Sequence, residues 1–178
     1  MRRVLLLIVS VATCVGLWIV PGPAAAAPPY CGQVWGSLDK TSGSMSSAPI
    51  TNVRAGRHDC FDRLVFDLAG PVSGYRAGYV GGISMDGSGA TVPVRGGAFL
   101  NIVVLAPAYD NAGNATYRPA NRGELVDVTG YQTFRQVAWA GSFEGQTTIG
   151  LGVRGRLPFR VFTLDGPARV VVDVAHFW

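Results

Sequence analysis

Glycine and proline cut the chain into short apolar segments from residue 50 onward, and few folds accept so many interruptions. The 178 residues include 24 glycines and 11 prolines, and turn signals recur about every 8 to 15 residues without a sustained period of 3.6. A helical bundle needs long uninterrupted amphipathic segments, and a disordered chain is less apolar than this one. The sequence therefore predicts one all-β domain, a sandwich or barrel with little or no helix outside the N-terminal segment.

Several segments have the composition of short strands bounded by turn residues. They are Ile50–Arg57, Arg63–Leu68, Gly74–Val80, Thr91–Val94, Phe99–Ala106, Leu125–Val128, Phe134–Gly141, Thr147–Val153, Phe159–Leu164 and Arg169–Val174. Between them, Pro107–Glu124 is the longest irregular stretch, and we expect it to form an exposed loop.

The N-terminus has the pattern of a secretory signal. Arg2 and Arg3 precede an unbroken apolar stretch, Val4–Val20, and a run of alanines follows. The small side chains there predict cleavage near Ala26 and a secreted protein of the extracytoplasmic cell envelope, with no membrane span after cleavage. An uncleaved membrane anchor is the main alternative, because the apolar stretch approaches the length of a spanning helix. We divide the chain into a signal peptide (1–26), a Ser/Gly/Pro-containing arm (27–49) and a β-domain (50–178).

Two cysteines remain after removal of that segment, which contains Cys14. In an exported chain an even number of thiols favours pairing, so we predict a disulfide between Cys31 and Cys60. The disulfide would tie the arm to the first strands of the domain. Two free thiols are the alternative.

Two segments repeat one pattern of Arg, three apolar residues and Asp: Arg63 to Asp67, and Arg169 to Asp173. Within each strand the two charges share a face but lie about 13 Å apart, too far to pair with each other. If the strands are antiparallel neighbours in register, Arg63 faces Asp173 and Asp67 faces Arg169. We therefore predict antiparallel pairing with charge pairs on an exposed face. A ligand-binding charge cluster is the alternative.

Charge and motifs argue against several classes of function. The formal charge of +4 includes Arg2 and Arg3 of the predicted signal peptide, and the charge that remains without them, 13 minus 11 or +2, is too small to indicate nucleic-acid binding. The sequence lacks the motifs of serine hydrolases, zinc peptidases and phosphate-binding loops. His58 and His176 could meet only if the first and last strands pair, and with Asp59 or Asp62 they would make a weak metal site. We predict no enzyme activity, no catalytic residues, no metal and no cofactor.

The richest aromatic and amide stretch runs from Tyr131 to Glu144. Flat rings stack on sugars and guanidinium groups bind carboxylates, so this stretch is our first candidate for a binding groove. Packing of Trp139 in the core is the alternative. A second candidate is a basic edge formed by Arg154, Arg156 and Arg160 around a turn. The candidate binding residues are Tyr131, Arg135, Trp139, Phe143, Arg154 and Arg156.

The segment from Phe159 to Asp173 and the segment from His58 to Asp67, with Pro71 and Tyr75-Arg76, resemble the AMIN-like domain. That family is a relative of the AMIN domain of bacterial cell-wall amidases and secretin pilotage systems. The opening His-Asp, x, Phe-Asp-Arg is similar to its actinobacterial branch. The resemblance implies an antiparallel β-sandwich without catalysis. In the parent AMIN family such a module concentrates its owner at the septum or binds peptidoglycan.

Two functions fit these observations. The first is a non-catalytic envelope module that binds peptidoglycan or another wall glycan. The second is a domain that docks envelope proteins by adding a strand at an exposed sheet edge. A surface row of aromatic side chains favours the first function, and a long unpaired edge favours the second.

Overall fold

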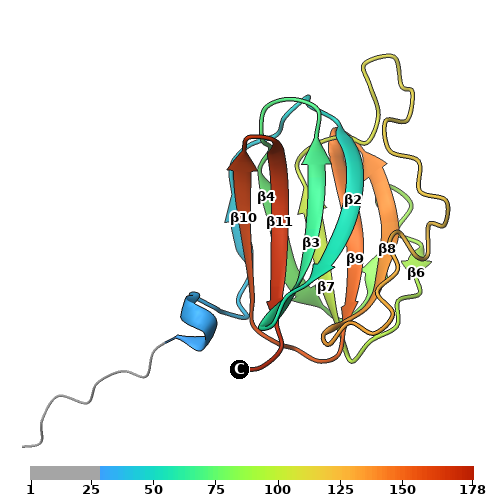
Figure 1. Cartoon of the computed structure of the whole chain (residues 1–178). Coiled ribbons are helices and arrows are strands. Elements are labelled where there is room, and N and C mark those ends of the chain that lie inside the picture. Colours follow the sequence, from blue (N-terminus) through green and yellow to red (C-terminus); the bar gives the residue numbers. More distant parts are fainter. Residues whose placement is uncertain (1–28) are drawn as a thin grey trace, which may run out of the picture.

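The computed structural model describes residues 29–178, so the predicted signal peptide lies outside the described residues. The described chain forms an antiparallel β-sandwich, as predicted, with a five-stranded sheet of order β1-β4-β7-β9-β8 and a four-stranded sheet of order β10-β11-β3-β2 (Figure 1). A small ribbon of β5 and β6 accompanies them. The elements are η1 (Tyr30–Gly32), β1 (Lys40–Ser42), β2 (Ile50–Arg57), β3 (Phe61–Leu68), β4 (Tyr75–Val80), β5 (Ile83–Ser84), β6 (Thr91–Val92), β7 (Ala98–Val104), β8 (Phe134–Phe143), β9 (Gln146–Val153), β10 (Phe159–Asp165) and β11 (Ala168–Ala175).

The core lies between the two sheets and follows the period-2 alternation of their strands. In β3, Leu64 and Phe66 are fully buried, and in β7 Leu100 and Ile102 are fully buried opposite them in the same apolar cluster. All strands, the core cluster and the disulfide belong to residues 29–178, so a chain that begins at Ala27 retains them.

The predicted strand Leu125–Val128 is wrong. This segment lies beside the edge strand β8, where the Leu125 amide donates to the Val137 carbonyl at 2.8 Å. The chain then turns away, so no strand forms. The turn is stabilised by Asp127, whose carboxylate accepts the Thr129 amide at 2.8 Å. Two short strands, β1 and β5, were not predicted, because neither carries an apolar run long enough to be recognised.

The arm, residues 29–49, covers one side of the sandwich. Its Gly36 carbonyl accepts the amide of Phe159 at the start of β10, and its strand β1 pairs with β4. Beyond β1 the arm crosses the chain so closely that a side chain on Gly74 would overlap the backbone of Gly43. The arm therefore hydrogen-bonds to the edge strand β10 of one sheet and supplies the edge strand β1 of the other.

The loop from Pro107 to Thr133 covers the other side. Its Pro107 carbonyl accepts the amide of Ile50 in β2, and its Arg122 carbonyl accepts the amide of Trp139 in β8 at 2.7 Å. Arg57 of β2 donates to the Gly130 carbonyl at 3.5 Å. These hydrogen bonds satisfy some of the backbone groups of the edge strands that could otherwise pair with a strand of another molecule.

β3 and β11 are antiparallel neighbours, with Asp173 opposite Arg63 and Asp67 opposite Arg169, the register that the repeated pattern predicts. Arg63 binds Asp173 through two hydrogen bonds of 2.7 and 2.9 Å, and this contact raises the pKa of the Arg63 guanidinium. The second predicted ion pair does not form. Asp67 binds Arg54 of β2 at 2.9 Å, and Arg169 donates to the Pro167 carbonyl at 3.0 Å.

Asp173 is fully buried, which corrects the expectation of an exposed charged face. A second guanidinium, that of Arg160 in β10, binds the same carboxylate at 2.7 Å and also donates to the side-chain oxygen of Gln33 in the arm. Aromatic rings surround the two guanidinium groups at centroid distances of 5.0 to 5.5 Å, and these rings are Trp35, Phe61 and Phe162. One arm segment thus covers a charge network that joins three strands.

The Cys31–Cys60 disulfide is confirmed, with Cα atoms 6.3 Å apart. It joins η1 in the arm to the turn between β2 and β3, and closes a sequence separation of 29 residues. The arm is therefore covalently attached at one end and hydrogen-bonded along its length.

We expect Asp173→Asn to lower the free energy of unfolding by about 3 kcal/mol, because it leaves two largely buried guanidinium groups without their counter-ion. The matched control is Asp67→Asn, which removes an exposed ion pair and should cost less than about 1 kcal/mol. Urea unfolding of both variants measures the difference. Equal losses in the two variants would contradict a special role for the buried carboxylate.

Removal of the disulfide by the double substitution Cys31→Ser and Cys60→Ser should cost about 3 to 4 kcal/mol, since the loop that it closes gains freedom in the unfolded chain. Thermal unfolding with and without reductant provides the check. The wild-type protein should lose stability on reduction and the double variant should not change. If the reductant lowered the unfolding temperature of both proteins by a similar amount, the Cys31–Cys60 disulfide would not be the source of this stability.

Candidate functional site

An open groove of about 640 Å³ lies between the loop after β7 and the end of β8. Its aromatic lining comes from two sources: Trp139 and Phe143 belong to β8, and Tyr109 and Tyr117 belong to the loop. We call this hollow the Trp139 groove. The remaining side chains and backbone that line it are Met85, Asp86, Ala108, Gly113, Ala115, Arg118, Pro119, Arg122, Gly141 and Ser142.

A break in the β8 pairing places the rings. The register of β8 against β9 shifts between Trp139 and Ser142, and Gly141 in this irregularity has φ of +120°, a conformation that favours glycine. The rings of Trp139 and Tyr117 lie 5.9 Å apart with their planes tilted by 41°. Partial burial beside the core raises the pKa of Tyr117, so its hydroxyl stays neutral at physiological pH.

Positive charge lines the rim of the groove. Arg118 and Arg122 are exposed, and none of the ion pairs within residues 29–178 includes either of them. Asp86 also lines the groove, and its carboxylate accepts a hydrogen bond of 3.3 Å from the Thr148 hydroxyl. The groove therefore combines flat rings with two guanidinium groups that are available to carboxylate or phosphate oxygens.

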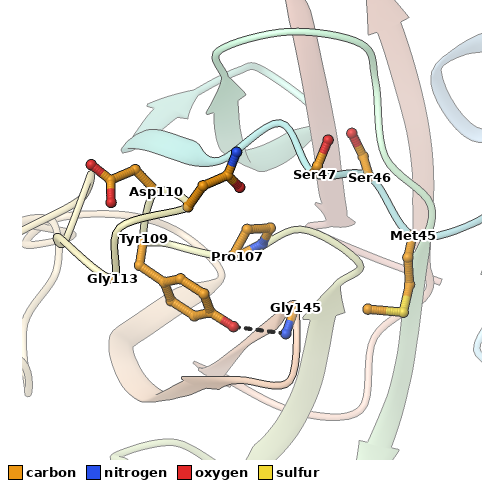
Figure 2. A pocket seen from close by; sticks show the side chains of 9 residues that line it. Met45, Ser46, Ser47, Pro107, Tyr109, Asp110, Gly113 and Gly145 are labelled. Atoms are coloured by element: carbon orange, nitrogen blue, oxygen red, sulfur yellow. Dashed lines mark hydrogen bonds between the residues drawn. The ribbon is translucent and has the colours of Figure 1, made fainter.

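A second hollow, of about 540 Å³, adjoins the Trp139 groove and shares Tyr109 and Gly113 with it. Figure 2 shows the Tyr109 ring reaching toward Gly145, whose amide donates to the Tyr109 hydroxyl at 2.9 Å. Met45, Ser46 and Ser47 of the arm line the hollow from the other side (Figure 2). Together the two hollows extend along both sides of Tyr109, a shape that suits an elongated ligand rather than a compact one.

The loop that supplies Tyr109 is ordered by its own side chains. The Asp110 carboxylate accepts the amides of Ala112 at 2.9 Å and Asn114 at 2.8 Å, and the Asn114 side chain adds a third bond at 3.1 Å. The hydrogen bonds from Asn114 lower the pKa of Asp110. The carboxylate thus remains charged and holds the loop shape on which the hollow depends.

The Trp139 groove contains two of the six candidate binding residues, Trp139 and Phe143. Trp139 lines the groove and also packs against the core, so both predicted roles describe part of its surface. Tyr131 and Arg135 line a separate hollow of about 330 Å³. There, Tyr131 stacks on Phe134 and Arg135 donates to nearby backbone carbonyls at 2.8 to 3.3 Å.

The predicted basic edge is divided. Arg160 binds Asp173 in the buried network, whereas Arg154 and Arg156 lie at the end of the sandwich away from the Trp139 groove. Sequence reasoning missed Tyr117, Arg118 and Arg122, because they belong to the stretch interpreted only as an exposed loop. The available signal was the presence of two tyrosines, Tyr109 and Tyr117, within that polar loop.

The pairing of β3 with β11 brings His58 and His176 close together, but their two rings do not face a common site. His176 is buried, with Nδ1 2.9 Å from the Thr133 hydroxyl and Nε2 2.9 Å from the His58 carbonyl oxygen. The His58 ring stacks on Phe61 instead. The carboxylate of Asp62 accepts the amides of Thr133 and Phe134 at 2.6 and 2.9 Å. These groups join the loop to the ends of β3 and β11.

Within the part of the chain that the structure describes, no group of three or more His, Cys, Asp or Glu side chains has the arrangement of a metal site. The same residues include no helix with the length and apolar character needed to span a membrane.

The family model described as the AMIN-like domain matches residues 48–176, which include every strand from β2 to β11 and all the groove residues of the loop and β8. No curated protein and no solved structure matches the chain.

Proposed function

Because this chain belongs to the AMIN-like domain family, we propose that it is a secreted, non-catalytic module of the cell envelope that binds peptidoglycan or another wall glycan. Membership of the family indicates a cell-wall-associated module. The disulfide fits an extracytoplasmic location, where thiols are oxidised. The N-terminal pattern of Arg2-Arg3, an apolar stretch and alanines supports export.

The observation that carries the proposal is the pair of neighbouring rings, Trp139 and Tyr117, that line an open groove. Sugar rings present flat apolar C–H faces, and tryptophan and tyrosine stack on such faces while their polar atoms remain hydrated. Arg118 and Arg122 at the rim suit the carboxylates that a peptidoglycan strand carries on its sugars and stem peptides.

The continuation of the Trp139 groove past Tyr109 also suits a polymer. The two hollows together offer a ligand path along the end of the sandwich, with aromatic side chains on one side and Ser46 and Ser47 of the arm on the other. Repeating sugar units would occupy successive positions along it. A single small molecule would need only one of the two hollows.

Docking of a protein strand is the weaker alternative. The arm hydrogen-bonds to β10 through Gly36 and to β4 through β1, and the loop hydrogen-bonds to β2 and β8. These contacts occupy backbone groups that strand addition would require. We therefore place binding in the groove rather than at a sheet edge.

We expect the chain from Ala27 to Trp178 to pellet with insoluble peptidoglycan sacculi and to remain bound at high salt, because stacking is not screened by ions. Trp139→Ala should weaken binding about tenfold, as loss of a central aromatic contact does in other binding sites. Phe143→Ser should weaken it about threefold, since Phe143 is 50% exposed at the groove. The measurement is the fraction of each of the three proteins that pellets with the sacculi at a low and at a high salt concentration.

The matched control is Phe177→Ser, which removes an aromatic side chain of similar exposure, 53%, at the opposite end of the sandwich. Its binding to sacculi should equal that of the wild type. Thermal unfolding separates lost binding from lost folding for Trp139→Ala, and Phe143→Ser changes only an exposed side chain. Wild-type binding that disappears at high salt, or that neither groove substitution reduces, would reject the glycan site.

A further inference from the structure

A group of exposed apolar side chains lies where the two chain ends of the described domain meet. Val34 is 86% exposed, Phe177 53% and Trp178 73%. Val34 and Trp178 line an apolar hollow of about 320 Å³ together with Tyr30 and Trp35, and the rest of its lining is Pro29, Gln33 and Pro158. Phe177 joins this group through its contact with the Tyr30 ring. We call Tyr30, Val34, Trp35, Phe177 and Trp178 the terminal surface. Exposed apolar side chains gathered in this way mark an interaction site more often than chance.

Hydrogen bonds and ring contacts hold the terminal surface in place. The Trp35 indole donates to the Tyr30 carbonyl at 2.8 Å, and the Trp178 indole donates to the Arg156 carbonyl at 3.2 Å. The rings of Tyr30 and Phe177 meet edge to face at 6.2 Å. The disulfide of Cys31 fixes the arm beside them. The apolar side chains are thus presented by an ordered surface and not by a loose tail.

The border of the terminal surface is positively charged. Arg154 and Arg156 are exposed, and the ion pairs within residues 29–178 include neither. The Arg154 guanidinium lies 5.9 Å from the Phe177 ring centre and donates to the His176 carbonyl. Arg156 lies 5.2 Å from the Tyr79 ring centre. Both cations remain available to an anionic partner next to the apolar side chains.

This combination matches the boundary between the headgroups and the acyl chains of a lipid bilayer. Tryptophan and tyrosine concentrate at that boundary because their rings are apolar at one end and polar at the other, and arginine near the surface is attracted to anionic headgroups. We propose that the terminal surface docks the domain on an anionic phospholipid membrane. This inference does not depend on the proposed glycan function.

The position of the surface in the chain favours a membrane as the occupant. Eight residues separate the apolar stretch Val4–Val20 from Pro29, which belongs to the hollow of the terminal surface. A segment of this kind enters a membrane during export, and it remains there if it is not cleaved. In either case the terminal surface includes the part of the described chain that follows this segment most closely in the sequence.

The direction of the strands places the Trp139 groove at the far end. The groove lies beside the β8–β9 turn, where Gln146 pairs with Phe143 and Val104 with Thr147. The terminal surface follows Ala175, which pairs with Phe61 at the opposite end of the strands (Figure 1). A domain docked through the terminal surface would therefore direct its groove away from the membrane and toward the wall.

The test is co-sedimentation of the chain from Ala27 to Trp178 with vesicles of phosphatidylcholine alone and of phosphatidylcholine mixed equally with phosphatidylglycerol, at physiological salt. Binding should be strong only to the mixed vesicles. Phe177→Ser and Trp178→Ser should each reduce it about tenfold, because a large apolar side chain no longer leaves water. Arg156→Gln should reduce it about fivefold, the loss expected for one cation near an anionic surface. All three side chains are exposed, so each variant should keep the wild-type unfolding temperature.

Phe143→Ser is the matched control and should bind vesicles as the wild type does. Absence of wild-type binding to the mixed vesicles would overturn the proposal. So would an equal loss with Phe143→Ser, or no loss with Phe177→Ser and Trp178→Ser. If Phe177→Ser abolishes sacculus binding or dissociates a dimer while vesicle binding is absent, the terminal surface binds a glycan or a second copy instead. Sacculus binding measured in parallel separates failure of this proposal from failure of the glycan site.

Discussion

A carboxylate that leaves water must be surrounded by donors, and Asp173 in β11 finds them on both neighbouring strands. Arg63 of β3 and Arg160 of β10 bind its two oxygens, so the register of three adjacent strands depends on one buried charge. Arg160 also reaches Gln33 of the arm. The arm in turn contributes a strand to the opposite sheet, which links the charge network to the assembly of the whole sandwich.

The pairing of β3 with β11 was accessible from the sequence because it depends on two strands alone. The spacing of Arg63 from Asp67, repeated at Arg169 and Asp173, favours a single antiparallel register, and the structure has it. A pattern in two strands contains no information about a third. Arg54 of β2 therefore displaced Arg169 as the partner of Asp67, and Arg160 joined Asp173 without any signal in the sequence.

The candidate groove was only half predictable for a related reason. Trp139 and Phe143 stand in a recognisable aromatic strand, whereas Tyr117 reaches the groove through a loop that has no periodicity to analyse. The irregular register after Trp139 further removes the alternation from which a side-chain direction is inferred. Loops of this kind are positioned by backbone contacts to the sheet, such as that between Arg122 and Trp139, which only the folded chain displays.

The Cys31–Cys60 disulfide joins the two ends of a segment that includes most of the exposed arm. An endopeptidase that cuts the serine-rich part of the arm, between Ser42 and Ser47, would therefore release no fragment. The N-terminal piece would stay covalently attached through Cys31 and hydrogen-bonded through Gly36 and β1. The nicked molecule would be heavier than the intact one by the water taken up in hydrolysis, and its two pieces would separate only after the cystine is reduced.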